Sequence, residues 1–296
     1  MGCTTPWPTA GSAPKPRPRP AESGGCAMSD TEETIVHYAS GNVREAMFAA
    51  LRAAGHDPAR LRAEDTNEAD HLHLGGMHTT AWIADTLALD DGARLLDVGS
   101  GMGGPARYFA GRGATVTGVD VTAEFVDLAT ELNRACGLDG AVTMLNRPGQ
   151  DAGLPEGSFD AALMLHVGMN IADKAPVFAE VFRLLRPGGV FGVYDLMGTN
   201  ELTFPMPWAI TRESSHVESE TAYRGYLEGA GFDVQRSMEH RDEVLARAAL
   251  MLQQGGAPLS GALILGEDVV LRRQHSIEAV RDRQVTPTLL ISRKPE

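Results

Sequence analysis

Short apolar runs alternate with amphipathic segments from residue 93 to the end of the chain. The apolar runs predict strands at 94–99, 115–120, 141–146, 159–165, 190–196, 232–238 and 286–292. Apolar residues at helical spacing predict helices between them, at 104–111, 122–136, 173–186 and 218–230. We expect the helix over 173–186 to end at 187-PGG-189. The repeated strand–helix alternation predicts an α/β protein with a doubly wound, mostly parallel sheet.

Helical patterns also lie outside this alternation. Residues 31–55 and 76–89 precede the first strand and predict a helical cap, while 242–254 and 266–283 precede the last strand and predict a lid or a partner surface. The Gly- and Pro-rich segment 255–261 separates the latter two. The resulting organisation is a disordered, Pro-rich leader (1–30), a cap (31–90), a cofactor-binding core (91–200), and a substrate or lid region with the final strands (201–296).

Composition narrows the function. The formal net charge is −13 and the Lys and Arg residues are scattered, so the sequence disfavours a nucleic-acid partner. No apolar run is long enough to predict a membrane span. The three cysteines fit neither a disulfide framework nor a metal site, and we expect a cytoplasmic protein. His71, His73 and His78 match no clean ligand spacing, so no metal is predicted.

The stretch 94-RLLDVGSGMGGPARYFA-110 predicts a nucleotide-binding turn between the first strand and its helix. Its glycines can be read as G-x-G-x-x-G, typical of dinucleotide sites, or as D-x-G-x-G-x-G. Pro105 removes an N–H donor that a pyrophosphate would use, and the Asp97 carboxylate is poorly placed for a phosphate ligand. Asp97 suits the ammonium group of S-adenosylmethionine instead. Asp120, at the end of the second strand, fits ribose hydroxyls in either case.

The ordered blocks 94-RLLDVGSGMGGPARYFA-110, 118-GVD-120, 150-QDAGLPEGSFD-160 and 181-VFRLLRPGGVFGVYD-195 resemble the class I S-adenosylmethionine-dependent methyltransferases. The resemblance implies a Rossmann-like, seven-stranded sheet whose last strand is antiparallel. It also implies that the loop holds the methionine end of the cofactor, that Asp120 holds the ribose, and that Gln150 or Asp151 reads the adenine. The expected cofactor-binding residues are Asp97, Gly99, Ser100, Gly101, Met102, Gly103, Asp120, Val121, Gln150, Asp151, Ala152, Leu165 and His166.

Three further segments, 73-HLGGMHTTAWIA-84, 164-MLHVGMNIADK-174 and 202-LTFPMPWA-209, resemble sarcosine/dimethylglycine N-methyltransferases, with tocopherol and quinone C-methyltransferases as near relatives. His166 either orients or deprotonates the acceptor, as a catalytic residue, or packs against the adenosyl group. In relatives of the sarcosine type this position is often acidic, so His166 disfavours a cationic or amino-acid acceptor. The expected acceptor-binding residues are Met169, Asn170, Tyr194, Asp195 and Trp208.

The sequence thus predicts methyl transfer from S-adenosylmethionine to a small-molecule acceptor, foremost an amine nitrogen. A carbon or oxygen acceptor of the quinone, phenol or natural-product kind is the alternative. Two hypotheses from other classes are a catalytically silent binding protein and an NAD-dependent oxidoreductase. The pattern leaves a homodimer open.

Overall fold

The computed structural model describes residues 30–39, 41–253 and 268–296. The predicted leader, apart from Asp30, and the Gly- and Pro-rich segment 255–261 lie outside the described residues, as do the adjoining ends of the two helices predicted around that segment. In the part of the chain that the structure describes, no helix is long and apolar enough to cross a membrane.

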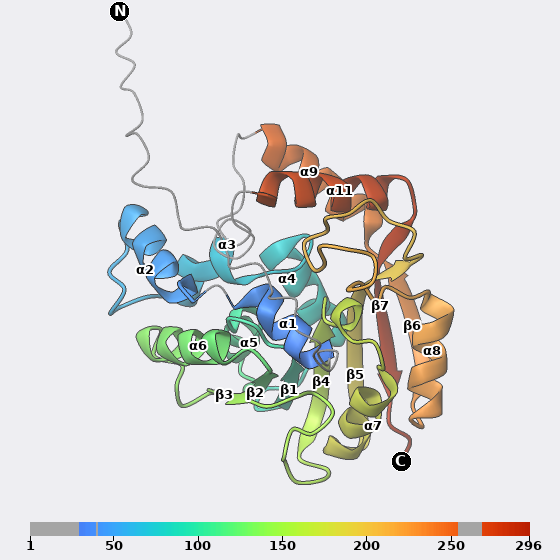
Figure 1. The fold of residues 1–296 in the computed structure, drawn as a ribbon. Helices are drawn as coiled ribbons and strands as arrows, with labels where there is room; N and C mark the ends of the chain where they lie inside the picture. The colour runs from blue at the N-terminus through green and yellow to red at the C-terminus, as the bar shows by residue number, and fades with distance from the viewer. Residues whose placement is uncertain (1–29, 40, 254–267) are drawn as a thin grey trace, which may run out of the picture.

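A single seven-stranded sheet forms the centre of the molecule (Figure 1). Its strands are β1 (Arg94–Val98), β2 (Thr115–Asp120), β3 (Val142–Asn146), β4 (Phe159–Leu165), β5 (Leu185–Gly198), β6 (Asp233–Glu239) and β7 (Val285–Arg293). The order is β3-β2-β1-β4-β5-β7-β6, and β7 runs antiparallel between β5 and β6. The predicted doubly wound sheet with an antiparallel last strand is confirmed. The strand order runs outward in opposite directions from β1 and from β4, which are themselves parallel. Open α/β sheets bind ligands at such a switch point.

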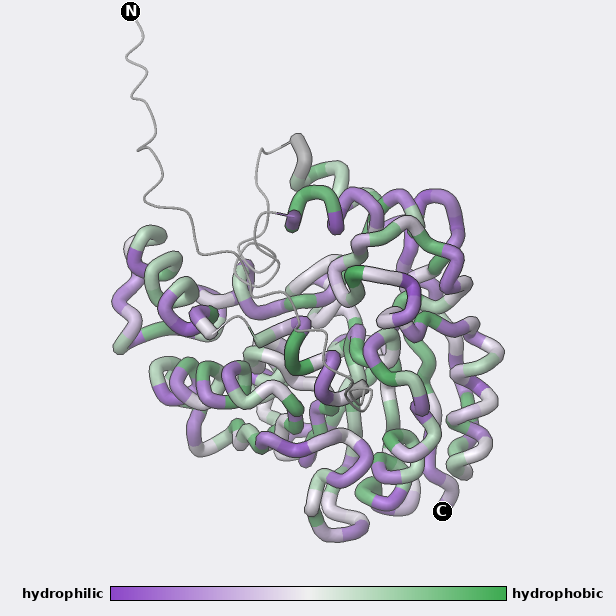
Figure 2. The backbone as a smooth tube through the Cα atoms, viewed as in Figure 1, coloured by the Kyte–Doolittle hydropathy of each residue, from purple (hydrophilic) through white to green (hydrophobic). Residues whose placement is uncertain are grey.

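Helices cover both faces of the sheet because neighbouring strand residues point to opposite sides. Leu96 packs with α7 (Ala175–Leu184) and α8 (Glu220–Gly229), while Leu95 packs with α4 (Gly76–Leu87) and α5 (Gly104–Ala110). Hydrophobic and hydrophilic positions alternate along α6 (Ala123–Ala135) and α8 in Figure 2. Such amphipathic helices bury one face and expose the other.

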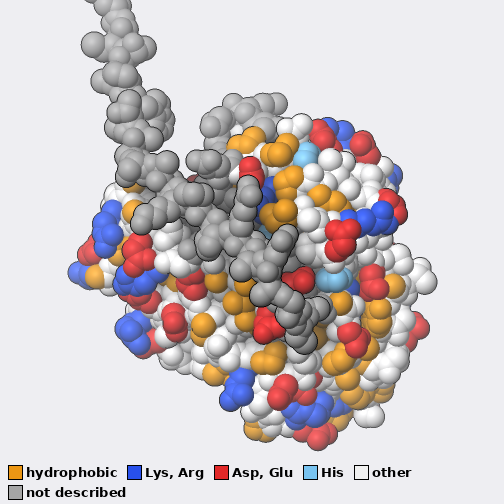
Figure 3. Space-filling view, in the orientation of Figure 1, with side chains coloured by type: hydrophobic (Ala, Val, Ile, Leu, Met, Phe, Trp, Pro, Cys, Tyr) orange, Lys and Arg blue, Asp and Glu red, His pale blue; other side chains and the backbone are white. Residues whose placement is uncertain are grey.

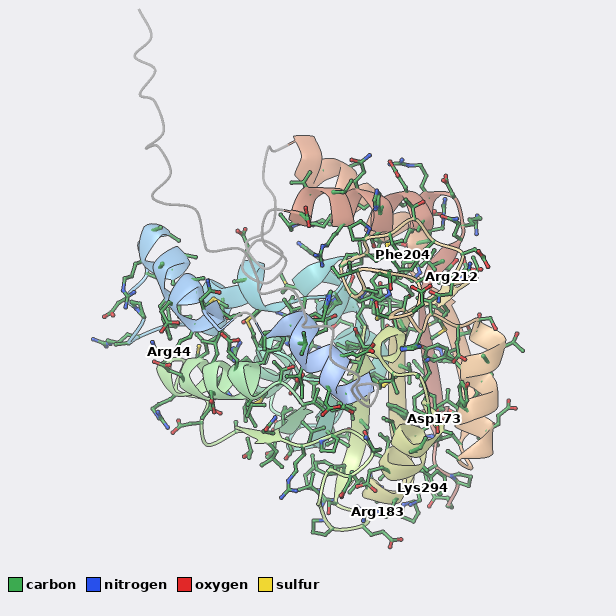
Figure 4. The ribbon with its side chains drawn as sticks, viewed as in Figure 1. Arg44, Asp173, Arg183, Phe204, Arg212 and Lys294 are labelled. Carbon is green, nitrogen blue, oxygen red and sulfur yellow. The ribbon has the colours of Figure 1, made fainter. Side chains whose placement is uncertain are left out.

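Strand β5 begins earlier than its sequence predicts. The expected helix stop at 187-PGG-189 lies inside the strand, because α7 already ends at Leu184 and Leu185 pairs with Phe159 of β4. An irregularity follows, since the next pairing joins Ala161 to Val190. Lys294 completes the end of α7: its Nζ donates to the carbonyls of Phe182 and Leu185, both at 2.8 Å (Figure 4).

The cap contains α1 (Asp30–Tyr38), α2 (Val43–Ala53), a 3₁₀ turn η1 (Ala63–Thr66), α3 (Asn67–Asp70) and α4. Apolar residues of α2, among them Met47 and Leu51, pack on Leu128 and Leu132 of α6. Arg44 of α2, labelled in Figure 4, forms an ion pair with Glu131 of α6 at 2.7 Å. The sequence does not predict η1 and α3, since each is too short to show a hydrophobic period.

A buried ion pair fastens the cap to the core. The Arg107 guanidinium on α5 donates to the Asp70 carboxylate on α3 at 2.6 Å, and both side chains are 1% exposed. Arg107 also donates to Asn133 Oδ1 of α6 at 2.7 Å and to the Met102 carbonyl at 2.6 Å. One guanidinium therefore joins the cap to the glycine loop and to two core helices.

The helices α9 (Arg241–Gln253) and α11 (Val269–Arg281) lie between β6 and β7 in the chain and pack against one another (Figure 1). They match the two helices predicted before the last strand. On the face shown in Figure 3, Lys and Arg side chains are interspersed with Asp and Glu side chains among the described residues.

We predict that Asp70→Ala lowers the free energy of unfolding by about 3–5 kcal/mol, because it leaves the Arg107 guanidinium buried without its counter-charge. Urea denaturation followed by circular dichroism measures this difference. Glu131→Ala, which breaks the exposed Arg44 ion pair, is the matched control and should move the urea midpoint little. Equal shifts in the two variants would contradict a special role for the buried pair.

Candidate functional site

A cavity of about 790 Å³ lies beyond the carboxyl ends of β1, β2 and β4. Its floor is made by the loops that follow these strands, at Gly99, Asp120 and His166. Its other walls come from α1, from residues 64–78, and from α9 and α11. A cavity at the switch point of an open α/β sheet is the expected ligand site of this architecture.

The loop after β1 approaches the cavity with bare backbone. Gly99, Gly101 and Gly103 have φ of 70°, 52° and 79°, in the left-handed region that favours glycine. A Cβ on Gly99 would lie 2.3 Å from Val167 Cγ2, so this position cannot carry a side chain without displacing its neighbour. Pro105 follows at the start of α5, where its missing N–H leaves the helix intact.

The Asp97 side chain lines the cavity, and its carboxylate is buried. The residue is 2% exposed, and its Oδ2 has no hydrogen-bond partner among the described residues. Burial, with a smaller contribution from the charge of Asp120, raises the pKa of this carboxyl to about 7. A buried acceptor without a donor is costly, so this position suits a cationic hydrogen-bond donor on a ligand.

Asp120 lies on the neighbouring strand and orders the same loop. Its Oδ2 accepts from the Gly101 N–H and its Oδ1 from the Thr122 N–H, both at 2.8 Å. Burial raises the pKa of this carboxyl, and the two backbone donors oppose the change. Each oxygen keeps a lone pair for a further donor, so ribose hydroxyls remain compatible with this arrangement.

The residues predicted for the adenine part separate in the structure. Gln150 lines the cavity, whereas Asp151 is exposed and lies outside the lining. The Ala152 N–H donates to Glu180 Oε1 at 3.3 Å. Of the two alternatives that the sequence left open, the structure brings Gln150 to the cavity.

His166 directly follows β4 and has a left-handed backbone, φ 57°, which is uncommon for a residue with a side chain. Its N–H donates to the Tyr194 carbonyl at 2.8 Å, and its ring stacks on that of Tyr194 with 5.2 Å between centroids. Nε2 has no hydrogen-bond partner among the described residues, and burial lowers the pKa to about 3. The cavity therefore contains a neutral imidazole with a vacant hydrogen-bonding nitrogen.

Two more histidines line the same cavity. His71 Nδ1 and His73 Nε2 each lie 2.9 Å from Thr80 Oγ1, and the His73 ring is 5.9 Å from that of His166. Burial lowers the pKa of both histidines. No group of three or more His, Cys, Asp or Glu residues within the described ranges is arranged to hold a metal ion. The sequence indicates His71, His73 and His78 only as a loose cluster; the adjacency of His73 to His166 depends on the fold.

Some predicted residues line the cavity and others support it. Those in the lining are Asp97, Gly99, Ser100, Gly101, Asp120, Val121, Gln150, Leu165, His166, Met169, Asn170 and Trp208. Those outside it are Met102, Gly103, Asp151, Ala152, Tyr194 and Asp195. Tyr194 supports the His166 ring from behind. Asp195 is buried, accepts from Tyr223 Oη at 2.7 Å, and has its pKa raised by burial to about 6.

The roof of the cavity includes residues that the sequence did not indicate. Tyr38 of α1 donates through Oη to Asn170 Oδ1 at 3.2 Å, and Thr34 donates to the Asn170 carbonyl at 3.4 Å. Trp208 is 5% exposed and donates from Nε1 to Ser215 Oγ at 2.9 Å, so it is packed as well as cavity-lining. These contacts close the cavity between segments that lie far apart in the sequence.

Comparison with known proteins agrees with this geometry. Residues 96–193 match the methyltransferase domain family. A sterol 24-C-methyltransferase of Gibberella zeae is 34% identical over 121 residues, which are 40% of this chain and 32% of that protein, so the match spans about a third of the relative. Geranyl diphosphate C-methyltransferase of Streptomyces coelicolor covers 90% of this chain and 99% of its own, with a TM-score of 0.66 and 18% identity. The match to Haemonchus contortus phosphoethanolamine N-methyltransferase 2 covers 77% of this chain and 54% of that chain, with a TM-score of 0.65 and 21% identity.

At these sequence identities the solved structures show a shared fold. The family match adds that residues 96–193 are of the methyltransferase class. Residues 96–193 are a methyltransferase domain, and the sheet has the order and the antiparallel last strand of the class I fold. The resemblance to the class I S-adenosylmethionine-dependent methyltransferases is confirmed.

We predict that Asp97 makes the stability of the protein fall as pH rises from about 4 to about 7. Its pKa is about 7 in the folded protein against 3.8 ordinarily, so the folded state holds a proton that the unfolded chain releases. Asp97→Asn removes this loss and should raise the free energy of unfolding at pH 8 by up to about 4 kcal/mol. Urea denaturation at each pH measures the change in slope.

Asp160→Asn is the control of opposite sign. Although burial opposes the change, hydrogen bonds from Arg94 and Arg186 hold the pKa of Asp160 at about 2, so its contribution is lost only as pH falls below about 4. This variant should leave the slope between pH 4 and 7 unchanged. An unchanged slope in Asp97→Asn as well would show that Asp97 does not titrate in this range.

Proposed function

We propose that this protein transfers a methyl group from S-adenosylmethionine to a small-molecule acceptor. The observation that carries the proposal is the unpartnered Asp97 carboxylate, buried beside a glycine loop in the cavity of a methyltransferase domain. A phosphate ligand would be repelled by this carboxylate, whereas an amino group would satisfy it. The same observation argues against the NAD-dependent alternative.

The residues present fit S-adenosylmethionine. Asp97 and the bare backbone of Gly99 and Gly101 would hold its methionine end, Asp120 its ribose, and Gln150 its adenine. When bound, the cofactor supplies a methyl group already activated by its sulfonium. What the chain must add is position and exclusion of water. The roof of the cavity formed by α1 over Asn170 supports that task.

The acceptor atom that we propose is an uncharged amine nitrogen, presented against His166. A neutral imidazole with a free Nε2 accepts a hydrogen bond from an N–H group and so orients the nitrogen lone pair. Because burial holds the pKa of His166 at about 3, the imidazole acts here as a positioning acceptor and is a weak base. Neutral His71 and His73 nearby leave a cationic acceptor without a counter-charge from these three side chains.

Transfer to carbon is the second candidate, favoured by the sterol C-methyltransferase that matches 40% of this chain. In that case the His166 imidazole would have no N–H partner and would serve to pack against the ligand. The two candidates predict different products, so product analysis separates them.

We predict that Asp120→Ala weakens binding of S-adenosylhomocysteine, the product form of the donor, by about ten- to a hundredfold, since a charged hydrogen-bond acceptor is lost. Isothermal titration calorimetry measures the affinity. Asp120→Asn should lose less, because it keeps one acceptor oxygen for the Gly101 N–H. Asp127→Ala, on the exposed side of α6, is the control and should bind as the wild type does. Heat with NADH and none with S-adenosylhomocysteine would overturn the proposed function.

We predict that incubation with methyl-labelled S-adenosylmethionine and a panel of amines, phenols and sterols places the label on nitrogen. Mass spectrometry with fragmentation identifies the labelled atom. His166→Asn should then lower kcat for that acceptor about tenfold or more, with the affinity for S-adenosylhomocysteine unchanged. Asn is chosen because it tolerates a left-handed backbone.

Label on carbon would replace the nitrogen proposal with the second candidate. Binding of donor with no labelled product from any acceptor would favour a catalytically silent binding protein. A loss of donor affinity with unchanged kcat in His166→Asn would assign this side chain to the cofactor.

A further inference from the structure

The wall of the cavity opposite the sheet is made by one face each of α9 and α11. From α9 the lining residues are Val244, Arg247, Ala248 and Met251, at the i, i+3, i+4, i+7 spacing of a single helix face. From α11 they are Arg273, Ser276 and Ile277, again at one-face spacing. We call these seven residues the α9/α11 wall. It combines an apolar surface with two guanidinium groups and one hydroxyl.

Neither guanidinium group of this wall has a counter-charge among the residues that the structure describes. Arg247 and Arg273 form no hydrogen bond or ion pair with any residue that the structure describes, although neighbours on the same helices do. Arg241 pairs with Asp242 at 2.9 Å, and Arg272 lies 3.9 Å from Asp268. The chain has 39 acidic and 26 basic residues, so two cations beside one cavity with no partner in the described ranges are unexpected.

Arg273 is also partly buried. Burial lowers the pKa of its guanidinium, and no carboxylate within the described residues contributes to the change. The carboxylates in the described lining belong to other elements: Glu64, Glu68, Asp70, Asp97, Asp120 and Asp173. A third arginine of the lining, Arg147, is exposed and follows β3, next to Asp120. The α9/α11 wall is therefore a separate, positively charged part of the cavity.

Ser276 gives an independent sign of a missing ligand. It is 1% exposed, lines the cavity, and its Oγ has no hydrogen-bond partner within the described ranges. It lies one helical turn from Arg273, on the same face of α11. A buried hydroxyl without a partner is costly, and a ligand oxygen at this point would satisfy both side chains together.

We propose that the α9/α11 wall binds an oxyanion, a carboxylate or a phosphate, carried by an acceptor whose surface is apolar apart from this group and the atom that is methylated. Arg273 and Ser276 contact the oxyanion, Arg247 adds a second positive charge, and Val244, Ala248, Met251 and Ile277 contact the apolar part. The inference rests on the proposed function, since it assigns this wall to the acceptor and the Asp97 end of the cavity to the donor. It narrows the acceptor class to amphipathic anions.

The test uses the full chain and isothermal titration calorimetry with four eight-carbon probes: octanoate, octyl phosphate, octan-1-ol and octylammonium. We expect one or both anions to bind at least tenfold more tightly than octan-1-ol, and octylammonium to bind most weakly. Arg273→Gln should lose about ten- to a hundredfold of the anion affinity, Arg273→Lys should retain most of it, and Ser276→Ala should lose less than Arg273→Gln. The anion bound more tightly, octanoate or octyl phosphate, distinguishes a carboxylate acceptor from a phosphate acceptor.

Arg281→Gln is the matched control, because Arg281 lies on the same helix, is exposed and does not line the cavity. It should bind all four probes as the wild type does. Each variant is also titrated with S-adenosylhomocysteine, whose affinity should not change. Equal binding of octan-1-ol and the anions, or an unaltered anion affinity in Arg273→Gln, would overturn the inference.

The two proposals can fail separately. A loss of S-adenosylhomocysteine affinity in Arg273→Gln would mean that this arginine serves the carboxylate of the donor, which overturns the inference and leaves methyl transfer intact. Absence of S-adenosylhomocysteine binding in the wild type, with tight binding of octanoate or octyl phosphate, would overturn the proposed function and keep the oxyanion site.

Discussion

Burial of the Asp97 carboxylate near the carboxyl end of β1 is the constraint on which the site depends. A charge at this depth is tolerated only if the surrounding backbone comes close and a ligand supplies a donor, and its pKa of about 7 reflects that cost. The glycine loop allows the approach, because a Cβ at Gly99 would collide with Val167. Asp120 then fixes the same loop from β2 through the Gly101 N–H.

The same loop is fixed from behind by the cap. The Arg107 guanidinium donates hydrogen bonds to the Met102 carbonyl, the Asp70 carboxylate and the Asn133 side chain. The loop, α3 and α6 therefore share one buried cation. This attachment at Asp70 holds residues 64–78 against the core, and this segment brings His71 and His73 to the cavity. The histidine-lined part of the site thus depends on an ion pair that does not itself touch the ligand region around His166.

The sheet and the cofactor loop were predictable because their signals are local. Apolar runs mark each strand, and the Asp97–Gly103 spacing marks the turn after β1. The sequence predicts β5, but the strand begins earlier than the pattern indicates, because α7 already ends at Leu184 and Leu185 pairs with Phe159 of β4. Short cap elements such as α3 carry no period and were missed.

The acceptor half of the cavity could be predicted only in part, because it depends on contacts between distant segments. His166 and Asn170 were found through the strand they follow, whereas Tyr38, His71 and Arg273 reach the cavity from elements that no local pattern places there. The sequence places Tyr194 and Asp195 near the end of a strand on the ligand side. In the structure they lie inside β5, and packing directs them behind His166 and toward Tyr223. The sequence pattern predicts the carboxyl ends of the strands well. It does not predict which of the side chains near those ends reach the cavity.

The position of β7 has a consequence for the order of assembly. Among the described residues, β6 lies at the edge of the sheet and pairs with β7 alone. The helices α9 and α11 lie between these two strands in the chain. During synthesis the strands β1 to β5 can therefore pair before the wall of the cavity exists. That wall forms only when the most C-terminal strand inserts between β5 and β6, a contact of long sequence separation that is slow to form. A nascent chain would thus complete the glycine loop and the strands around it first and the α9/α11 wall last.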